Sequence, residues 1–340
     1  MQINSLIQAR FALWVTLLAL VVILLGAYVR LSDAGLGCPD WPGCYGKLIV
    51  PSSEAEIASA NTIYPHRPLE TDKAWKEMVH RYLASTLGLC ILALAVIALR
   101  RRDQAGQPLL VPWTLALLVA LQGALGMWTV TLQVKPIIVT AHLLGGLATI
   151  ALLWILTLKL YSPSINPYVI YHNRRLLWLS RFGVVILLMQ ILLGGWTSTN
   201  YAAIGCTDFP TCHSGQWWPT LAMKEAFTLW HGTDINFEYG ILSAEARTTI
   251  HMMHRLGALA TALYLSILCI TLYRIGRATI THKMAWVIGL LLSLQVGLGI
   301  TNVLGHLPLP IAVAHNGVAA LLLLTLLTLN WQLKRAYTMG

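Results

Sequence analysis

Four histidines lie at matched places in the apolar part of this sequence. They are His80, His142, His254 and His315. An ionisable side chain is costly to place in an apolar environment and there usually serves a function. Imidazole is a common ligand of metal ions, so these residues are candidates for metal binding. Glu77 lies three residues before His80, on the same face if the segment is helical, where its carboxylate can act as an acid or a base.

The stretch around the first of these histidines has a partial copy around the third. Arg81 and Arg255 follow the two histidines, and both copies continue into an apolar run. Such an arginine either extends to the membrane surface or binds a carboxylate with its fork of N–H groups. His251 takes the place of Glu77 in the second copy, as a further ligand, a hydrogen-bond partner or an interfacial residue.

The composition indicates that these side chains are held by an integral membrane protein. Of the 340 residues, 57% are hydrophobic and 11% are charged, whereas soluble domains carry about 25% charge. The net charge of +10 does not indicate nucleic-acid binding, because the basic residues form short clusters between apolar runs and no basic stripe with aromatic residues is present. The first apolar run, residues 11–29, is longer than the core of a signal peptide, so we expect a retained helix.

Eight apolar runs are long enough to cross a bilayer, and they predict an all-α protein with eight transmembrane helices. The second and sixth are short unless their helices begin earlier, which would place His80 and His254 inside helices near one membrane face. The runs are residues 11–31, 78–99, 109–132, 136–158, 176–199, 250–273, 284–303 and 309–333.

Charge predicts the orientation of these helices. One side of the eight-helix arrangement receives most of the basic residues, and the positive-inside rule makes that side cytoplasmic. Both termini are then cytoplasmic, two long loops (residues 32–76 and 200–248) lie outside, and the multi-pass protein is expected in a bacterial plasma (inner) membrane. The basic residues are Arg10, Arg100, Arg101, Arg102, Lys159, Arg174, Arg175, Arg274, Arg277, Lys283, Lys334 and Arg335.

The chain contains an internal duplication. Several features recur in the same order about 170 residues apart. The recurring pairs are Cys38 and Cys206, Cys44 and Cys212, His80 and His254, Gln122 and Gln295, Gly126 and Gly299, and His142 and His315. Each half has four predicted helices, so both halves insert in the same orientation. We therefore expect two four-helix bundles, residues 1–165 and 170–340, related by a pseudo-twofold axis along the membrane normal.

The duplication gives each bundle two histidines at matched depth, near the outer face. Two facing imidazoles can hold a haem iron by both of its axial positions, so the sequence predicts one haem site in each half. Zinc or copper is the competing interpretation, but a closed zinc site needs four ligands, often thiolates. Cys90 and Cys269 lie deeper in their predicted helices, as small buried side chains do.

Two cysteine pairs lie in the outer loops, Cys38 with Cys44 and Cys206 with Cys212. An oxidising compartment favours a disulfide in each pair. Closing so short a loop stabilises the protein by about 2–3 kcal/mol in the chain-entropy description. The disulfides are either staples that fix the outer loops or a redox pair that exchanges with a thiol carrier. The spacing of five intervening residues differs from that of disulfide oxidoreductases.

Glu77 distinguishes the two predicted haem sites. A carboxylate one helical turn from an axial ligand lies near the haem edge, where it can act as a base or stabilise positive charge on a ring substituent. The alternative is a glutamate that complements the dipole at the start of a helix. If Glu77 takes part in chemistry, the first half holds a haem that is altered and the second half holds a haem that serves as cofactor. Arg81 and Arg255 would then be candidate partners of haem propionates.

Taken together, these features resemble the haem A synthase family. The resemblance covers nearly the whole chain and includes the eight helices, the duplication, the four histidines and Glu77. It also includes the loop segment Gly35-Leu36-Gly37-Cys38-Pro39-Asp40-Trp41-Pro42. Membership implies oxidation of haem O to haem A, in which successive hydroxylations turn a ring methyl into a formyl group. It implies that His80 and His142 hold haem O, that His254 and His315 hold haem B, and that Glu77 is catalytic.

Partners follow from the same expectation. The enzyme that makes haem O is a candidate partner, the electron acceptor would be a quinone or a thiol carrier, membrane lipid surrounds the helices, and a homo-oligomer is compatible with the sequence. Two rival functions use the same haem sites. One is a di-haem cytochrome that transfers electrons across the membrane, and the other is a haem transporter or chaperone without chemistry.

Overall fold

The computed structural model describes residues 2–161, 174–232, 235–275 and 280–339, and in these ranges the chain is helical, without a β-sheet. Eight helices are long and apolar enough to cross a membrane, which confirms the predicted all-α multi-pass protein. They are α1 (Gln2–Leu31), α3 (Thr71–Arg100), α4 (Leu110–Thr131), α5 (Pro136–Tyr161), α6 (Arg174–Thr199), α8 (Ala244–Ile275), α9 (Ile280–Leu304) and α10 (Leu309–Met339).

The second and sixth transmembrane helices begin well before their apolar runs. α3 starts at Thr71 and α8 starts at Ala244, so both histidine stretches are helical, as their short apolar runs required. Two short helices, α2 (Glu54–Ile63) and α7 (Met223–Ala226), lie in the outer loops and were not predicted. The N-terminus of α2 is set by Ser53 and Glu56, which form a reciprocal capping box.

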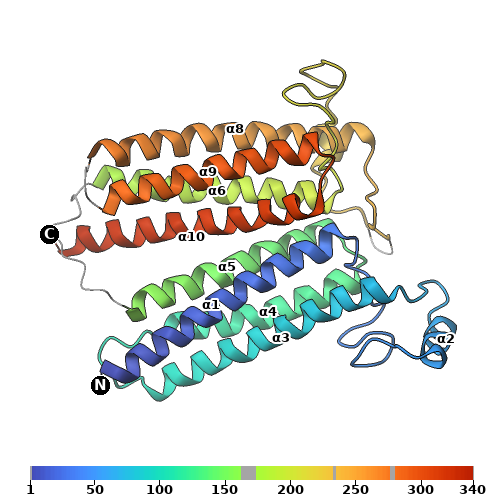
Figure 1. Ribbon diagram of the computed structural model, residues 1–340, viewed down its shortest axis with the longest axis horizontal. Helices are drawn as coiled ribbons and strands as arrows, with labels where there is room; N and C mark the ends of the chain where they lie inside the picture. The colour runs from blue at the N-terminus through green and yellow to red at the C-terminus, as the bar shows by residue number, and fades with distance from the viewer. Residues whose placement is uncertain (1, 162–173, 233–234, 276–279, 340) are drawn as a thin grey trace.

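The helices pack in two groups. α1 packs against α3 and α5, and α4 packs against α3 and α5; in the second group, α8 and α10 each pack against α6 and α9. The groups meet where α1 touches α10 and where α5 touches α6 and α10. Figure 1 shows α1, α3, α4 and α5 on one side and the other four helices opposite. This arrangement is compatible with the two predicted bundles, whose boundary at residues 165–170 lies outside the described ranges.

Polar contacts connect helices inside this apolar structure. Thr140 of α5 and Thr199 of α6 lie within hydrogen-bond distance, 3.2 Å between hydroxyl oxygens. The Trp154 indole of α5 donates to Thr328 of α10 at 2.8 Å. Both bonds cross between the two helix groups, so each half helps to set the position of the other.

The long loops lie at one end of the helices, opposite to the start of α1 and the end of α10 (Figure 1). The second loop also reaches over the first helix group. The Phe237 amide donates to the Gln133 carbonyl at 3.1 Å, and the phenyl ring is buried with Val130 and Val134. An ion pair joins Arg67 to Glu238. The loops therefore form one connected layer over the histidine ends of both helix groups.

Candidate functional site

The four candidate histidines lie on four different helices. His80 is on α3, His142 on α5, His254 on α8 and His315 on α10. His80 lies near enough to His142 for their charges to interact, and His254 lies near enough to His315. The structure therefore brings together the two pairs that the duplication predicts, one pair in each helix group.

Each histidine ring lies against a glycine of a neighbouring helix. Methyl groups at these glycines would lie only 3.0 Å, 3.6 Å, 3.1 Å and 3.2 Å from the Cε1 atoms of the four rings. The pairs are Gly26 with His80, Gly126 with His142, Gly194 with His254, and Gly299 with His315. Because three of these distances are shorter than ordinary contacts, a side chain in place of glycine would push the rings away from the next helix. Gly126 and Gly299 were recognised in the sequence as a repeat, but Gly26 and Gly194 were missed.

The residue types at these pairs fit a haem. The rings of His80, His142 and His315 are buried, and their Nδ1 atoms have no hydrogen-bond partner among the described residues. In the same part of the chain, no three His, Cys, Asp or Glu side chains cluster as metal ligands. Two imidazoles are too few for a closed zinc site, but they complete the coordination of an iron whose other four ligands come from a porphyrin.

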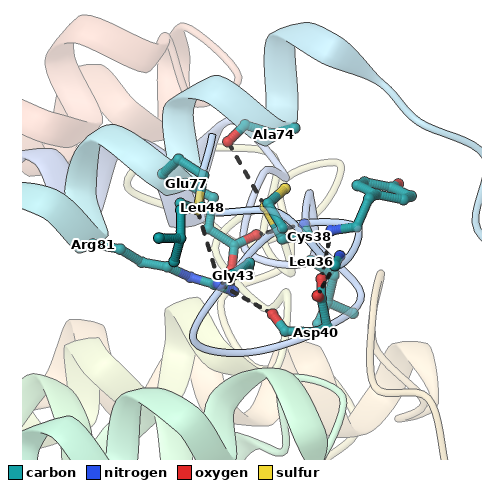
Figure 2. The surroundings of a disulfide bond; sticks show 12 residues. Leu36, Cys38, Asp40, Gly43, Leu48, Ala74, Glu77 and Arg81 are labelled. Carbon is teal, nitrogen blue, oxygen red and sulfur yellow. Dashed lines mark hydrogen bonds and ion pairs between the residues drawn. A yellow bond between two sulfur atoms is a disulfide. The ribbon is translucent and has the colours of Figure 1, made fainter. Parts of the chain in front are cut away.

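Glu77 lies on the side of α3 that faces the first outer loop, and its carboxylate is buried and paired with other groups. The residue is only 4% exposed. One carboxylate oxygen accepts the backbone N–H of Cys38 at 2.9 Å, and the other pairs with Arg81. Figure 2 shows the carboxylate directed from α3 toward the disulfide loop. The buried pair needs both partners, because an unpaired charge there would cost several kcal/mol.

The second half builds the same contact with a different acceptor. His251, also 4% exposed, accepts the backbone N–H of Cys206 through Nδ1 at 3.0 Å. The Arg255 side chain packs beside the same ring, with its Nε 3.3 Å from the other ring nitrogen. His251 is therefore the hydrogen-bond partner among the three roles predicted for it. The two halves share one loop attachment, and only the first half places a carboxylate in it.

Arg81 and Arg255 hold the disulfide loops. Arg81 donates to the carbonyls of Asp40 and Gly43 at 3.0 and 2.6 Å. Arg255 donates to the carbonyls of Thr211 and Asp208 at 2.9 and 2.7 Å. Sequence analysis expected these arginines at the membrane surface or at propionates. The carbonyls of a loop some forty residues away were not foreseeable from the pattern.

Both predicted disulfides are present, Cys38–Cys44 and Cys206–Cys212. All four residues are at most 1% exposed, so a thiol carrier has no direct access to the sulfurs. This burial favours the staple interpretation over exchange. Gly37 brings the first loop onto α3, since a methyl group there would lie 2.6 Å from the Lys73 backbone.

A tyrosine closes the first loop on its outer side. The Tyr45 hydroxyl lies 3.1 and 3.2 Å from the carbonyls of Arg67 and Pro68, to which it donates. Burial raises the pKa of Tyr45 to about 12, so the phenol keeps its proton throughout the neutral range and remains a donor. Arg67 in turn donates to the Leu36 carbonyl at 3.1 Å and pairs with Glu238 of the second loop.

Comparison with known proteins agrees with this architecture. The COX15-CtaA family model, described as a cytochrome oxidase assembly protein, matches residues 9–327. The chain is 47% identical to the haem A synthase of Shewanella oneidensis, over 95% of this chain and 96% of the relative. It is 27% identical to the haem A synthase of Caulobacter vibrioides, over 95% and 96% of the two chains. With Agrobacterium fabrum haem A synthase the identity is 29%, over 89% and 83%. The chain therefore belongs to the COX15-CtaA family of haem A synthases, multi-pass membrane oxidoreductases that convert haem O to haem A.

Proposed function

We propose that the two halves of this haem A synthase hold different haems. Residues 1–165 hold the substrate haem O between His80 and His142, and residues 170–340 hold haem B as a resident cofactor between His254 and His315. The paired rings and their glycine neighbours support two bis-histidine sites. When bound, haem B supplies a one-electron redox centre.

The difference between Glu77 and His251 carries the assignment of the substrate to the first half. Both residues accept a cysteine N–H and lie beside an arginine, so the loop attachment alone does not require a carboxylate. Glu77 becomes a neutral carboxylic acid when it takes up a proton, whereas His251 would become a cation beside Arg255. Each of the two hydroxylations of the haem O methyl adds the oxygen of a water molecule and releases two protons and two electrons. We assign the protons to Glu77 and the electrons to an external acceptor, a quinone or a thiol carrier, and the resulting geminal diol loses water to form the formyl group.

Arg81 and the disulfide loop position this acid–base group. The guanidinium of Arg81 is fixed by loop carbonyls and pairs with the Glu77 carboxylate. The buried disulfide keeps the loop, and with it the Cys38 N–H donor, in place. Loop and helix together exclude water from the carboxylate, which strengthens its interactions.

The proposed orientation places both sites toward the outer face of a bacterial plasma membrane, with both termini cytoplasmic. The disulfide loops lie at the histidine ends of the helices and the basic residues cluster at the other ends. Oxidising conditions outside the cytoplasm suit the disulfides, and the positive-inside rule suits the arginines. The haem O-forming enzyme then delivers its product at the outer leaflet.

Expression in a bacterial host that makes haem O but no haem A tests this function. Membranes containing the protein should yield haem A on extraction and chromatography, and membranes from cells with an empty vector should not. A cytochrome or a haem chaperone would bind haem and leave haem O unchanged, so the continued absence of haem A in a host with folded, haem-loaded protein would refute the proposal.

A further inference from the structure

The two histidine pairs differ in a way that does not involve Glu77. In the second half, the Gln190 side-chain amide lies 3.0 Å from Nδ1 of His254 and donates to the backbone carbonyl of the same residue at 3.1 Å. Its amide oxygen is buried and has no partner within the described part of the chain. The residue comes from α6, one turn before Gly194, the glycine against which His254 lies.

The first half offers no side-chain partner of this kind among the described residues. One turn before Gly26, the glycine that faces His80, stands Val22. Val22 is therefore the positional match of Gln190. The Val22 backbone is a hydrogen-bonding neighbour of the His80 ring, but Nδ1 of that ring has no partner in the described structure. Apolar Val22 cannot supply one from its side chain.

Glutamines on the neighbouring helices do not change this contrast. Gln295 lies 3.2 Å from Nε2 of His315, whereas Nδ1 of that ring is unbonded. Its positional match, Gln122, has an unpartnered amide nitrogen and packs against Gly145. Of the two glutamines that contact a candidate ligand, only Gln190 reaches Nδ1, the ring nitrogen that remains after Nε2 binds iron.

We propose that Gln190 is a positioning residue that fixes His254 as a permanent haem ligand, and that Val22 leaves His80 free to release its haem. An iron-bound imidazole carries its proton on Nδ1 and needs an acceptor there to fix its orientation. The Gln190 oxygen becomes that acceptor when the amide turns over at Nδ1, and the amide then gives up its hydrogen bond to the His254 carbonyl and shifts away from that oxygen. A resident cofactor needs an axial histidine whose orientation is fixed by a hydrogen bond at Nδ1. A substrate haem must leave as product, so its axial histidine is better left without that hydrogen bond. This inference rests on the proposed bis-histidine sites and gives a reason, independent of Glu77, for which half keeps its haem.

The test uses full-length protein purified from cells without a haem O source, so that haem B is the only haem bound. Gln190→Met keeps the length of the side chain and removes the hydrogen bond. We expect haem B to transfer to excess apomyoglobin about tenfold faster than from the wild type, since partners of this kind change metal affinity by about 10–100-fold. The reduction potential should rise as well, because a less basic imidazole stabilises ferric iron less. Gln122→Met is the matched control and should leave both quantities unchanged.

The converse variant, Val22→Gln, tests the same idea in the other half. In protein loaded with haem O, it should slow haem O transfer to apomyoglobin about tenfold, which a purely structural role of Gln190 would not produce. Unchanged transfer and potential in Gln190→Met, or unchanged haem O release in a folded Val22→Gln protein, would overturn the inference. His254→Ala distinguishes the two levels of the proposal. If it removes haem B while Gln190→Met has no effect, only the role of Gln190 is wrong; if it leaves haem B bound, the ligand assignment itself is wrong.

Discussion

Glu77→Gln is expected to stop haem A formation while both haems remain bound. General acid–base catalysis contributes about 10²–10⁴-fold to rates, so haem A in extracted membranes should fall at least about 100-fold. The amide oxygen of glutamine still accepts the Cys38 N–H, which keeps the loop attachment, but it cannot take up a proton. The measurement is chromatography of extracted haems, with the total haem content of the purified protein as the check on folding.

The folding check matters because Glu77 belongs to a buried ion pair. Its side chain is 6% exposed and that of Arg81 is 12% exposed, and breaking such a pair costs about 3–5 kcal/mol. Arg81 retains its loop carbonyls in the variant, which limits the loss. Glu70→Gln is the control, an exposed carboxylate at the start of α3 that should leave haem A formation as in the wild type. Normal haem A formation in Glu77→Gln would remove Glu77 from the chemistry.

The second large effect is expected at the axial ligands. His254→Ala should remove haem B almost completely, because losing one of two protein ligands leaves the iron with a single bond to the chain. His80→Ala should keep haem B and lose bound haem O. The two variants are matched controls for one another, since their positions correspond in the duplication and both rings lie against a glycine. Visible spectra and pyridine haemochrome content of the purified proteins give the measurement.

If both variants lost the same haem, the proposal that the two histidine pairs form separate haem sites would be wrong. Alanine also leaves a space next to Gly26 or Gly194, and a cavity of that kind destabilises a protein by about 2–5 kcal/mol in soluble cores. Thermal unfolding of the empty proteins therefore accompanies the spectra. A haem spectrum unchanged in both variants would show that these histidines are not ligands.

Much of this architecture was predictable because it rests on local or periodic patterns. The lengths of the apolar runs predicted the eight helices. Two of these runs are short, which predicted that α3 and α8 begin earlier in the chain and include the two histidine stretches. The position of two cysteine pairs in the outer loops predicted both disulfides, and the duplication predicted which histidines share a half. Each of these properties is carried by neighbouring residues or by a repeat in the sequence.

Other features depend on contacts between distant segments, and these were missed. Gly26 and Gly194 are ordinary glycines in apolar helices until the histidine of another helix is placed against them. The pairing of Arg67 with Glu238 joins two outer loops of different halves. Arg81 was assigned to the membrane surface or to a propionate because nothing in its local pattern indicates the carbonyls of Asp40 and Gly43. The match of Val22 with Gln190 could have been found by aligning the halves through α1 and α6.

The most direct test of two sites with different haems is the haem stoichiometry of the purified wild-type protein. Protein from cells that make haem O should contain haem B and, in equal amount, haem O, its hydroxylated form or haem A. Extraction followed by chromatography and protein quantitation gives the ratio. Haem B alone, in protein produced with an ample supply of haem O, would contradict the proposed division between a substrate half and a cofactor half.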